Sequence, residues 1–82
     1  MKTIISSAVA IYILQEGEKL KRSQSDRDYS RFYVIYPSGI YWKIFYFPYG
    51  EKNRTELPMC TSENEAFNLA YEHLIDNAKQ YI

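Results

Sequence analysis

Near the C-terminal end of the chain, apolar side chains recur every three or four residues, which is the pattern of one face of an α-helix. Ser62 and, three residues later, Glu65 form a capping box, and Thr61 offers a second hydroxyl cap. The pattern predicts a helix from about residue 62 to residue 80. Its core-facing positions are Ala66, Phe67, Ala70, Tyr71, Leu74, Ala78 and Tyr81. Its outward positions, which make an acidic exterior, are Glu65, Asn68, Glu72, Asp76 and Lys79.

The middle of the chain has the composition of two β-strands joined by a tight turn. Residues 32–36 and 40–47 are dominated by aromatic and β-branched side chains without a helical period, and Pro48 closes the second run. Pro37 and Gly39 between the runs suit a three-residue loop with a bulge at the glycine. We therefore expect a β-hairpin here.

This loop length fixes which side chains share a face of the hairpin. The pairs on the first face are expected to be Tyr36 with Ile40, Val34 with Trp42, and Phe32 with Ile44. The second face then carries Tyr29, Arg31, Tyr33 and Ile35 opposite Phe47, Phe45, Lys43 and Tyr41. A slip of one residue in this register would reassign both sets.

The N-terminal third predicts a second hairpin. Gly17 stands at the third position of a loop between an apolar run, residues 8–14, and a polar run, residues 18–22. A helix over residues 4–14 is the alternative, because its Ala and Ile residues also fit an amphipathic turn or two. The β-branched and aromatic side chains there favour strand.

These elements give the order β-β-β-β-α. The expected fold is an α+β two-layer domain, in which an antiparallel sheet of three to four strands, made of two hairpins, carries one C-terminal helix on one face. With 82 residues, the chain is expected to form a single domain, residues 1–82, because so short a sequence cannot fill two cores. A hydrophobic content of 46% and only three Gly and three Pro exclude disordered and collagen-like classes.

The cysteine content and the N-terminus bear on location. Cys60 is the single cysteine, so stability must come from packing, as in a reducing compartment, and we expect a cytoplasmic protein. Lys2 and the apolar residues after it resemble a short signal peptide. The apolar stretch before the small-residue pattern at 8–10 is nevertheless shorter than such a peptide requires. The longest apolar run, residues 8–14, is too short to cross a membrane.

Side chains that perform catalytic chemistry are scarce. His73 is the single histidine, and we interpret it as a half-exposed helix side chain rather than a base. Cys60 precedes the helix, where the helix dipole lowers a thiol pKa, but a nucleophilic cysteine needs a base within hydrogen-bond reach. His73 is expected roughly 15–20 Å away along the helix. We therefore expect a packed cysteine and a protein that is not an enzyme.

Metal and cofactor sites are not expected either. One Cys and one His do not make a zinc site. The acidic residues of the helix lack the alternating loop pattern of a calcium site, and the three glycines stand in predicted turns rather than in a phosphate-binding loop.

Both faces of the central hairpin are apolar, whereas one helix covers only one face. If the helix covers the face with Trp42 and Ile44, the opposite face is an exposed aromatic plate with two cations, which is typical of an interaction site. Ile35 belongs to this plate, and the expected binding residues are Tyr29, Arg31, Tyr33, Tyr41, Lys43, Phe45 and Phe47. The alternatives are cover by the N-terminal strand or by residues 49–57, or burial between two copies in a homodimer.

Two classes of partner suit such a plate. A protein partner is favoured, because ten basic and ten acidic residues leave a net charge of zero, whereas proteins that neutralise several phosphates are usually basic. As a small, tyrosine-rich chain with one cysteine, it looks like the accessory and inhibitor proteins that phages and mobile elements encode. A nucleic acid whose bases stack on the plate is the alternative. The order of a short sheet and a helix beginning at Thr61-Ser62, over about residues 29–80, resembles the arm-binding domains of phage-type integrases, which implies DNA binding by the sheet.

Overall fold

The structure contains the predicted helix and the strands expected near residues 8–14, 32–36 and 40–47, with one unpredicted strand at each edge of the sheet. A computed structural model describes residues 1–6, 9–20, 31–48 and 54–79, and of the last range the side chains as far as residue 76. The elements are β1 Lys2–Ser6, β2 Val9–Ile13, β3 Phe32–Ser38, β4 Tyr41–Phe47, β5 Thr55–Cys60 and α2 Glu63–Lys79.

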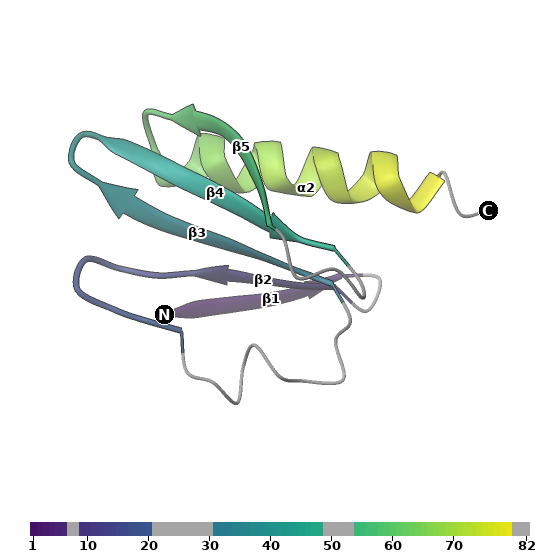
Figure 1. Ribbon diagram of the computed structural model, residues 1–82, viewed down its shortest axis with the longest axis horizontal. Helices are drawn as coiled ribbons and strands as arrows, with labels where there is room; N and C mark the ends of the chain where they lie inside the picture. The colour runs from purple at the N-terminus through teal and green to yellow at the C-terminus, as the bar shows by residue number, and fades with distance from the viewer. Residues whose placement is uncertain (7–8, 21–30, 49–53, 80–82) are drawn as a thin grey trace.

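The strands form one mixed sheet in the order β1-β2-β3-β4-β5, and α2 lies along one of its faces (Figure 1). All neighbouring strands are antiparallel except β2 and β3, which are parallel. The fold is therefore a small α+β domain with a C-terminal helix packed on its sheet, as expected. The expectation of three to four antiparallel strands is wrong, because the sheet has five strands and includes a parallel pair.

The N-terminal hairpin lies one strand upstream of its predicted place. β1 and β2 are its strands, so strand rather than helix is confirmed for this region. The predicted turn exists, since Gly17 has a φ of 83° and the Glu18 amide donates to the Gln15 carbonyl at 3.0 Å. No strand follows it over residues 18–20, so the predicted strand at 18–22 is wrong there, and residues 21–22 lie outside the described part.

β2 explains this difference. Every residue of β2 is buried, so it needs apolar neighbours on both edges and cover on both faces. The polar residues after Gly17 cannot supply such a neighbour, whereas the apolar strands β1 and β3 can.

The turn between β3 and β4 is shorter than predicted, and this changes the register. Ser38 pairs with Tyr41, which leaves Gly39 and Ile40 as a two-residue turn, and Gly39 has the left-handed φ of 65° that such a turn requires. Pro37 lies within β3, beyond the end of β2. Its missing N–H therefore costs no ladder hydrogen bond.

The predicted pairs are consequently wrong. The observed pairs are Phe32 with Phe47, Tyr33 with Tyr46, Val34 with Phe45, Ile35 with Ile44, Tyr36 with Lys43 and Pro37 with Trp42. The faces of β4 are as predicted, with Trp42 and Ile44 toward the helix, but the faces of β3 are exchanged.

β5 is a strand that the sequence did not predict. It contains Pro58, and its pairing shifts between Trp42 with Cys60 and Ile44 with Leu57, which marks a bulge. An edge strand tolerates both features, because only one of its sides must be hydrogen-bonded.

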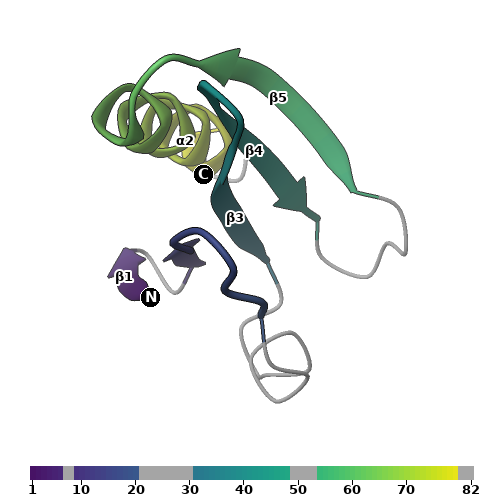
Figure 2. The same ribbon diagram turned by 90° about the vertical axis from the view of Figure 1, so that its left-hand side faces the viewer.

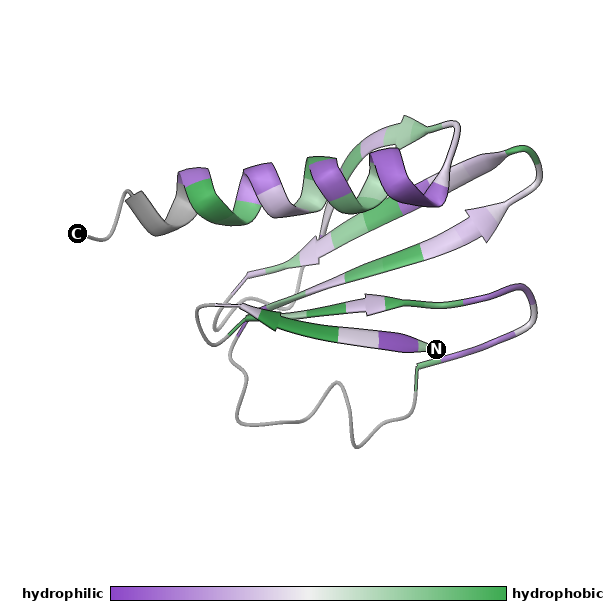
Figure 3. Cartoon of the chain, turned by 180° about the vertical axis from the view of Figure 1, so that it is seen from behind, coloured by the Kyte–Doolittle hydropathy of each residue, from purple (hydrophilic) through white to green (hydrophobic). Residues whose placement is uncertain are grey.

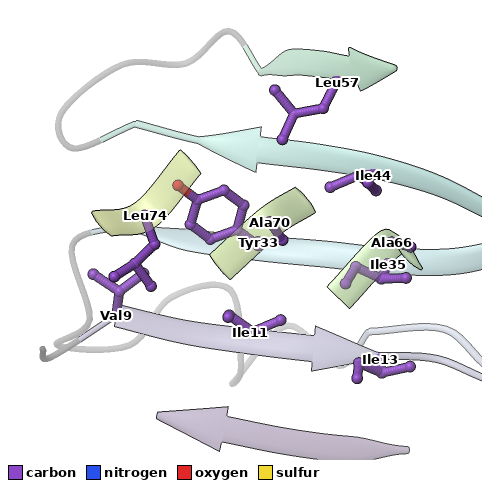
Figure 4. Close-up of a cluster of buried hydrophobic side chains, with 10 residues drawn as sticks. All are labelled: Val9, Ile11, Ile13, Tyr33, Ile35, Ile44, Leu57, Ala66, Ala70 and Leu74. Carbon is purple, nitrogen blue, oxygen red and sulfur yellow. The ribbon is translucent and has the colours of Figure 1, made fainter. Parts of the chain in front are cut away.

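Alternate side chains of the strands fill the core between the sheet and the helix. Figure 4 shows the buried side chains of β2, β3, β4 and β5 gathered beside the small side chains of α2. The members of this helix-side core are Val9, Ile11, Ile13, Tyr33, Ile35, Ile44, Leu57, Ala66, Ala70 and Leu74.

The helix begins where the capping box predicts. The Glu65 amide donates to the Ser62 hydroxyl oxygen at 3.1 Å, and the Glu65 carboxylate accepts from the Thr61 hydroxyl at 3.1 Å. Ala66, Ala70 and Leu74 are buried as predicted, whereas Phe67 is half-buried and Tyr71 is 39% exposed. Ala78 and Tyr81 lie outside the described side chains. The outward residues Glu65, Asn68, Glu72 and Asp76 are exposed and form the hydrophilic side of the helix (Figure 3).

Candidate functional site

The face of the sheet opposite α2, here called the outer face, carries the alternate side chains of the strands. Figure 2 shows α2 on one side of the sheet, with the outer face turned away from it. In β2 to β4 the period of two residues along each strand gives the outer face the side chains Ala10, Tyr12, Phe32, Val34, Tyr36, Tyr41, Lys43, Phe45 and Phe47.

The β2 and β3 part of the outer face is closed. Tyr12, Phe32 and Val34 are buried in a second core, against which Leu20 packs. The Tyr12 ring meets Phe32 edge-on at 5.9 Å, and Phe32 stacks on Phe47 at 4.4 Å. These rings fill the interior of the protein and offer little surface to a partner.

The β4 part of the outer face is open. Tyr41 is 42% exposed, and Tyr36, Lys43, Phe45 and Phe47 are half-buried. Tyr36 of β3 stacks on Phe45 of β4, with ring centroids 5.8 Å apart and planes 14° apart. The guanidinium carbon of Arg54, an exposed residue just before β5, lies 4.4 Å from the Phe45 ring centroid. We call Tyr36, Tyr41, Lys43, Phe45 and Arg54 the aromatic patch.

The Arg54 guanidinium keeps its capacity to donate hydrogen bonds while it lies over the Phe45 ring. A guanidinium over an aromatic ring is attracted by the ring quadrupole and still presents its N–H donors at the edge of its plane. Lys43 lies opposite Tyr36, and Glu56 lies opposite Phe45 on the same face. The patch therefore combines planar apolar surface with two cationic groups and one acidic group among the described residues.

The structure distributes the sequence-predicted binding residues among several places. Tyr41, Lys43, Phe45 and Phe47 lie on the outer face, where they were expected. Arg31 is half-buried just before β3, and Tyr29 lies outside the described residues.

Tyr33 and Ile35 are the corrections to this set. Both are buried in the helix-side core, Tyr33 at 1% exposed and Ile35 at 0%. Their expected place on the exposed plate is wrong, because the two-residue turn moves the β3 side chains by an odd number of positions relative to β4.

Sequence reasoning missed Tyr36 and Arg54. Tyr36 was assigned to the helix side by the same register error. Arg54 precedes a strand that was not predicted, so no pattern indicated that it would lie over Phe45.

Tyr33 takes part in a second aromatic group beneath the helix. Its hydroxyl lies 2.6 Å from Nδ1 of His73, and its ring stacks on Tyr46 at 4.7 Å. The His73 ring lies 4.9 Å from the Tyr46 ring. Burial lowers the pKa of His73, while Asp76 acts in the opposite direction. In the neutral tautomer that carries its proton on Nε2, the imidazole accepts a hydrogen bond from the Tyr33 hydroxyl at Nδ1, which satisfies a buried hydroxyl. This contact with Tyr33 gives His73 a structural role.

The lowered pKa of His73 predicts acid sensitivity. Below the ordinary histidine value of 6.5, the unfolded chain binds a proton that the folded protein resists, so the free energy of unfolding should fall as the pH is lowered from 6.5. Urea denaturation between pH 7.5 and 5 checks this. The variant His73→Gln should have a flatter profile in that range, and an equally steep profile would contradict this role of His73.

Cys60 is a half-buried side chain at the end of β5. It lies against the helix-side core, and its thiol lies 3.8 Å from the Pro58 carbonyl oxygen. Desolvation, followed by the nearby Glu65 carboxylate, raises the pKa of the thiol. A raised pKa reduces the thiolate that nucleophilic chemistry requires. Within the described ranges, no cluster of His, Cys, Asp and Glu is arranged to hold a metal ion.

No protein-family model, curated protein or solved structure matches this chain. Over the range of the resemblance to integrase arm-binding domains, about residues 29–80, the described strands before α2 are β3, β4 and β5. Among the described residues, no helix is both long enough and apolar enough to span a membrane.

Proposed function

We propose that this chain is a small, non-enzymatic binding protein, of the inhibitor or accessory type that phages and mobile elements encode, and that it recognises a protein partner through the aromatic patch. One observation carries the proposal. The Tyr36–Phe45–Arg54 stack crosses from β3 to the start of β5 on the sheet face without the helix, and its members remain accessible.

The residue types of the patch favour a protein partner. Tyrosine and arginine are enriched among the residues that contribute most to protein–protein binding, and the aromatic rings here are already held by their neighbours. Because the rings are stacked before binding, little side-chain entropy is lost when a partner covers them. The zero net charge of the chain is compatible with this class of partner.

The charges of the patch specify the partner further. Lys43 and Arg54 flank the rings, and among the described residues Glu56 is the acidic side chain beside them. The complementary surface is one with apolar side chains in its centre and carboxylates at its rim. A cytoplasmic setting belongs to the proposal, since the single cysteine is a free thiol.

Nucleic-acid binding is the second candidate, and the position of Arg54 favours it. Aromatic rings beside cations are also what single-stranded nucleic acid requires, with bases on the rings and phosphates on the cations. Phe45 with Arg54 and Lys43 supplies this combination on a small scale. The lack of excess positive charge argues against it.

Capture from a bacterial lysate tests the proposal and separates the two candidates. The immobilised protein should retain a defined protein partner after nuclease treatment, and retention should fall only modestly between low and high salt, because salt screens the charged rim but not the apolar centre. Phe45→Ala and Arg54→Ala should abolish capture, whereas Glu72→Ala on the exposed side of the helix should not.

Other outcomes would contradict the proposal. Retention of single-stranded nucleic acid with an affinity that falls steeply with salt would support the second candidate. Capture lost through Glu72→Ala but kept by Phe45→Ala would show that the acidic helix exterior is the binding surface.

A further inference from the structure

The two edges of the sheet differ in whether they can accept another strand. β5 forms one edge and carries Pro58 and a bulge, which are common devices against edge pairing. β1 forms the other edge, Lys2–Ser6, and pairs regularly with β2 along its whole length without proline or bulge. Within the described residues, no strand pairs with the outer side of β1. The β1 edge therefore presents backbone N–H and C=O groups in strand geometry.

Two ion pairs hold the N-terminal end of β1 in place. The N-terminal ammonium of Met1 lies 2.9 Å from the Glu18 carboxylate, and Lys2 Nζ lies 2.9 Å from Glu63 in the first turn of α2. Gln15 donates to the same Glu63 carboxylate at 2.9 Å. Lys2, the one charged side chain of β1, is thus directed toward the helix. It therefore does not prevent another strand from pairing with the edge.

An aromatic pair lies on one flank of α2, the helix that packs on β3, β4 and β5. His73 contacts Tyr33 and Tyr46, so it marks the flank that faces β3 and β4. At about 100° per residue, Phe67 and Tyr71 lie on the opposite flank of the helix. Their rings stack at 6.0 Å, and Tyr71 is 39% exposed.

Ile4 and Ile5 are the apolar side chains of β1 beside this edge. Ile4 faces the helix side and is only partly buried against the core, and Ile5, on the outer face, is 52% exposed. An added strand would therefore gain backbone hydrogen bonds and apolar contacts on both faces of the sheet.

We propose that the β1 edge binds β1 of a second copy of this chain, antiparallel and across a two-fold axis, so that one sheet continues through both subunits. The register centred on Ile4 pairs every residue of β1. It places Ile4 against Ile4 of the second copy, Thr3 against Ile5 of the second copy, and Lys2 against Ser6 of the second copy. This register opposes no like charges, whereas a register centred on Lys2 would oppose two lysines.

The blocked edge at β5 explains why assembly stops at two copies. Pairing of β1 with β5 of another copy would be heterologous and would extend without limit, but Pro58 and the bulge oppose it. Pairing of β1 with itself is isologous and leaves the blunted β5 edges on the outside of a closed dimer.

Sedimentation over a concentration series tests this assembly, with paired charges at two exposed positions. Thr3 and Ile5 are both exposed, so they accept changes without loss of the core. Thr3→Lys with Ile5→Lys places lysines opposite each other twice and should weaken the dimer by about tenfold or more. Thr3→Glu with Ile5→Lys pairs opposite charges in the same register and should restore most of the affinity.

Ile40→Lys is the control for added positive charge, because it adds one lysine at an isoleucine that is 79% exposed in the β3–β4 turn, and it should leave the dimer intact. Independently of any variant, amide exchange of β1 should slow as the concentration of the unmodified protein rises. A protein that is monomeric throughout the series would overturn the proposal. A dimer that resists the Lys–Lys variant but dissociates in Phe45→Ala would also overturn it and would place self-association on the aromatic patch.

Discussion

Replacing Tyr33 by alanine is expected to lower the free energy of unfolding by about 3–5 kcal/mol, which is a large part of the stability of a domain of this size. The Tyr33 side chain is 1% exposed, so its removal leaves a cavity in the helix-side core. It also removes the stack on Tyr46 at 4.7 Å and the hydroxyl contact with His73 at 2.6 Å. Urea denaturation with intrinsic fluorescence measures the change.

Tyr33→Phe separates the ring from its hydroxyl. This variant keeps the packing and loses the hydrogen bond to His73, so it should cost about 1–3 kcal/mol, with the imidazole left without that partner. A Tyr33→Ala variant as stable as the parent protein would mean that Tyr33 is exposed and that the β3–β4 register has the three-residue loop instead.

The neighbouring residues Ile44 and Phe45 provide the second large effect. Ile44 is 0% exposed and points into the helix-side core, so Ile44→Ala should cost about 2–5 kcal/mol in unfolding free energy. Phe45, the next residue along β4, points to the outer face and is half-buried, so Phe45→Ala should cost clearly less.

Because the two positions are adjacent, their difference tests which face of β4 is buried without depending on the stability of the rest of the chain. Thermal or urea denaturation of the two variants side by side makes the comparison. Equal losses would indicate that the outer face at β4 is as tightly packed as the helix side and has no surface to offer a partner.

The helix and the faces of β4 could be predicted because both depend on local signals. The Ser62–Glu65 capping box fixes the helix start, and the alternation from Trp42 onward fixes the faces of β4. The face of β3 depended on the length of one turn. The sequence around Gly39 suits either a two-residue or a three-residue loop, and the choice between them exchanges every side chain of the strand.

The missed strands have a different cause. β1 is only five residues long and carries Lys2 and Ser6 at its ends, and β5 carries Pro58, so neither has a strong strand pattern. Both are edges, where one side of the backbone stays unpaired and polar side chains or proline are tolerated. The parallel pairing of β2 with β3 joins segments separated by a long connection, and no local pattern encodes it.

The candidate site was predicted as far as β4 positions it. Tyr41, Lys43, Phe45 and Phe47 lie on the outer face because alternation along one strand is sufficient to place them. Arg54 reaches Phe45 only through the pairing of β5 with β4, which is a tertiary contact. The aromatic patch therefore could not be completed from the sequence.

Mapping the contact surface by nuclear magnetic resonance tests the central claim most directly. Addition of the captured partner to the isotope-labelled protein should shift or broaden the signals of Tyr36, Tyr41, Lys43, Phe45 and Arg54 and leave those of the exposed helix residues unchanged. Changes confined to Glu65, Asn68, Glu72 and Asp76, with the patch signals unaffected, would contradict the claim that the aromatic patch binds the partner.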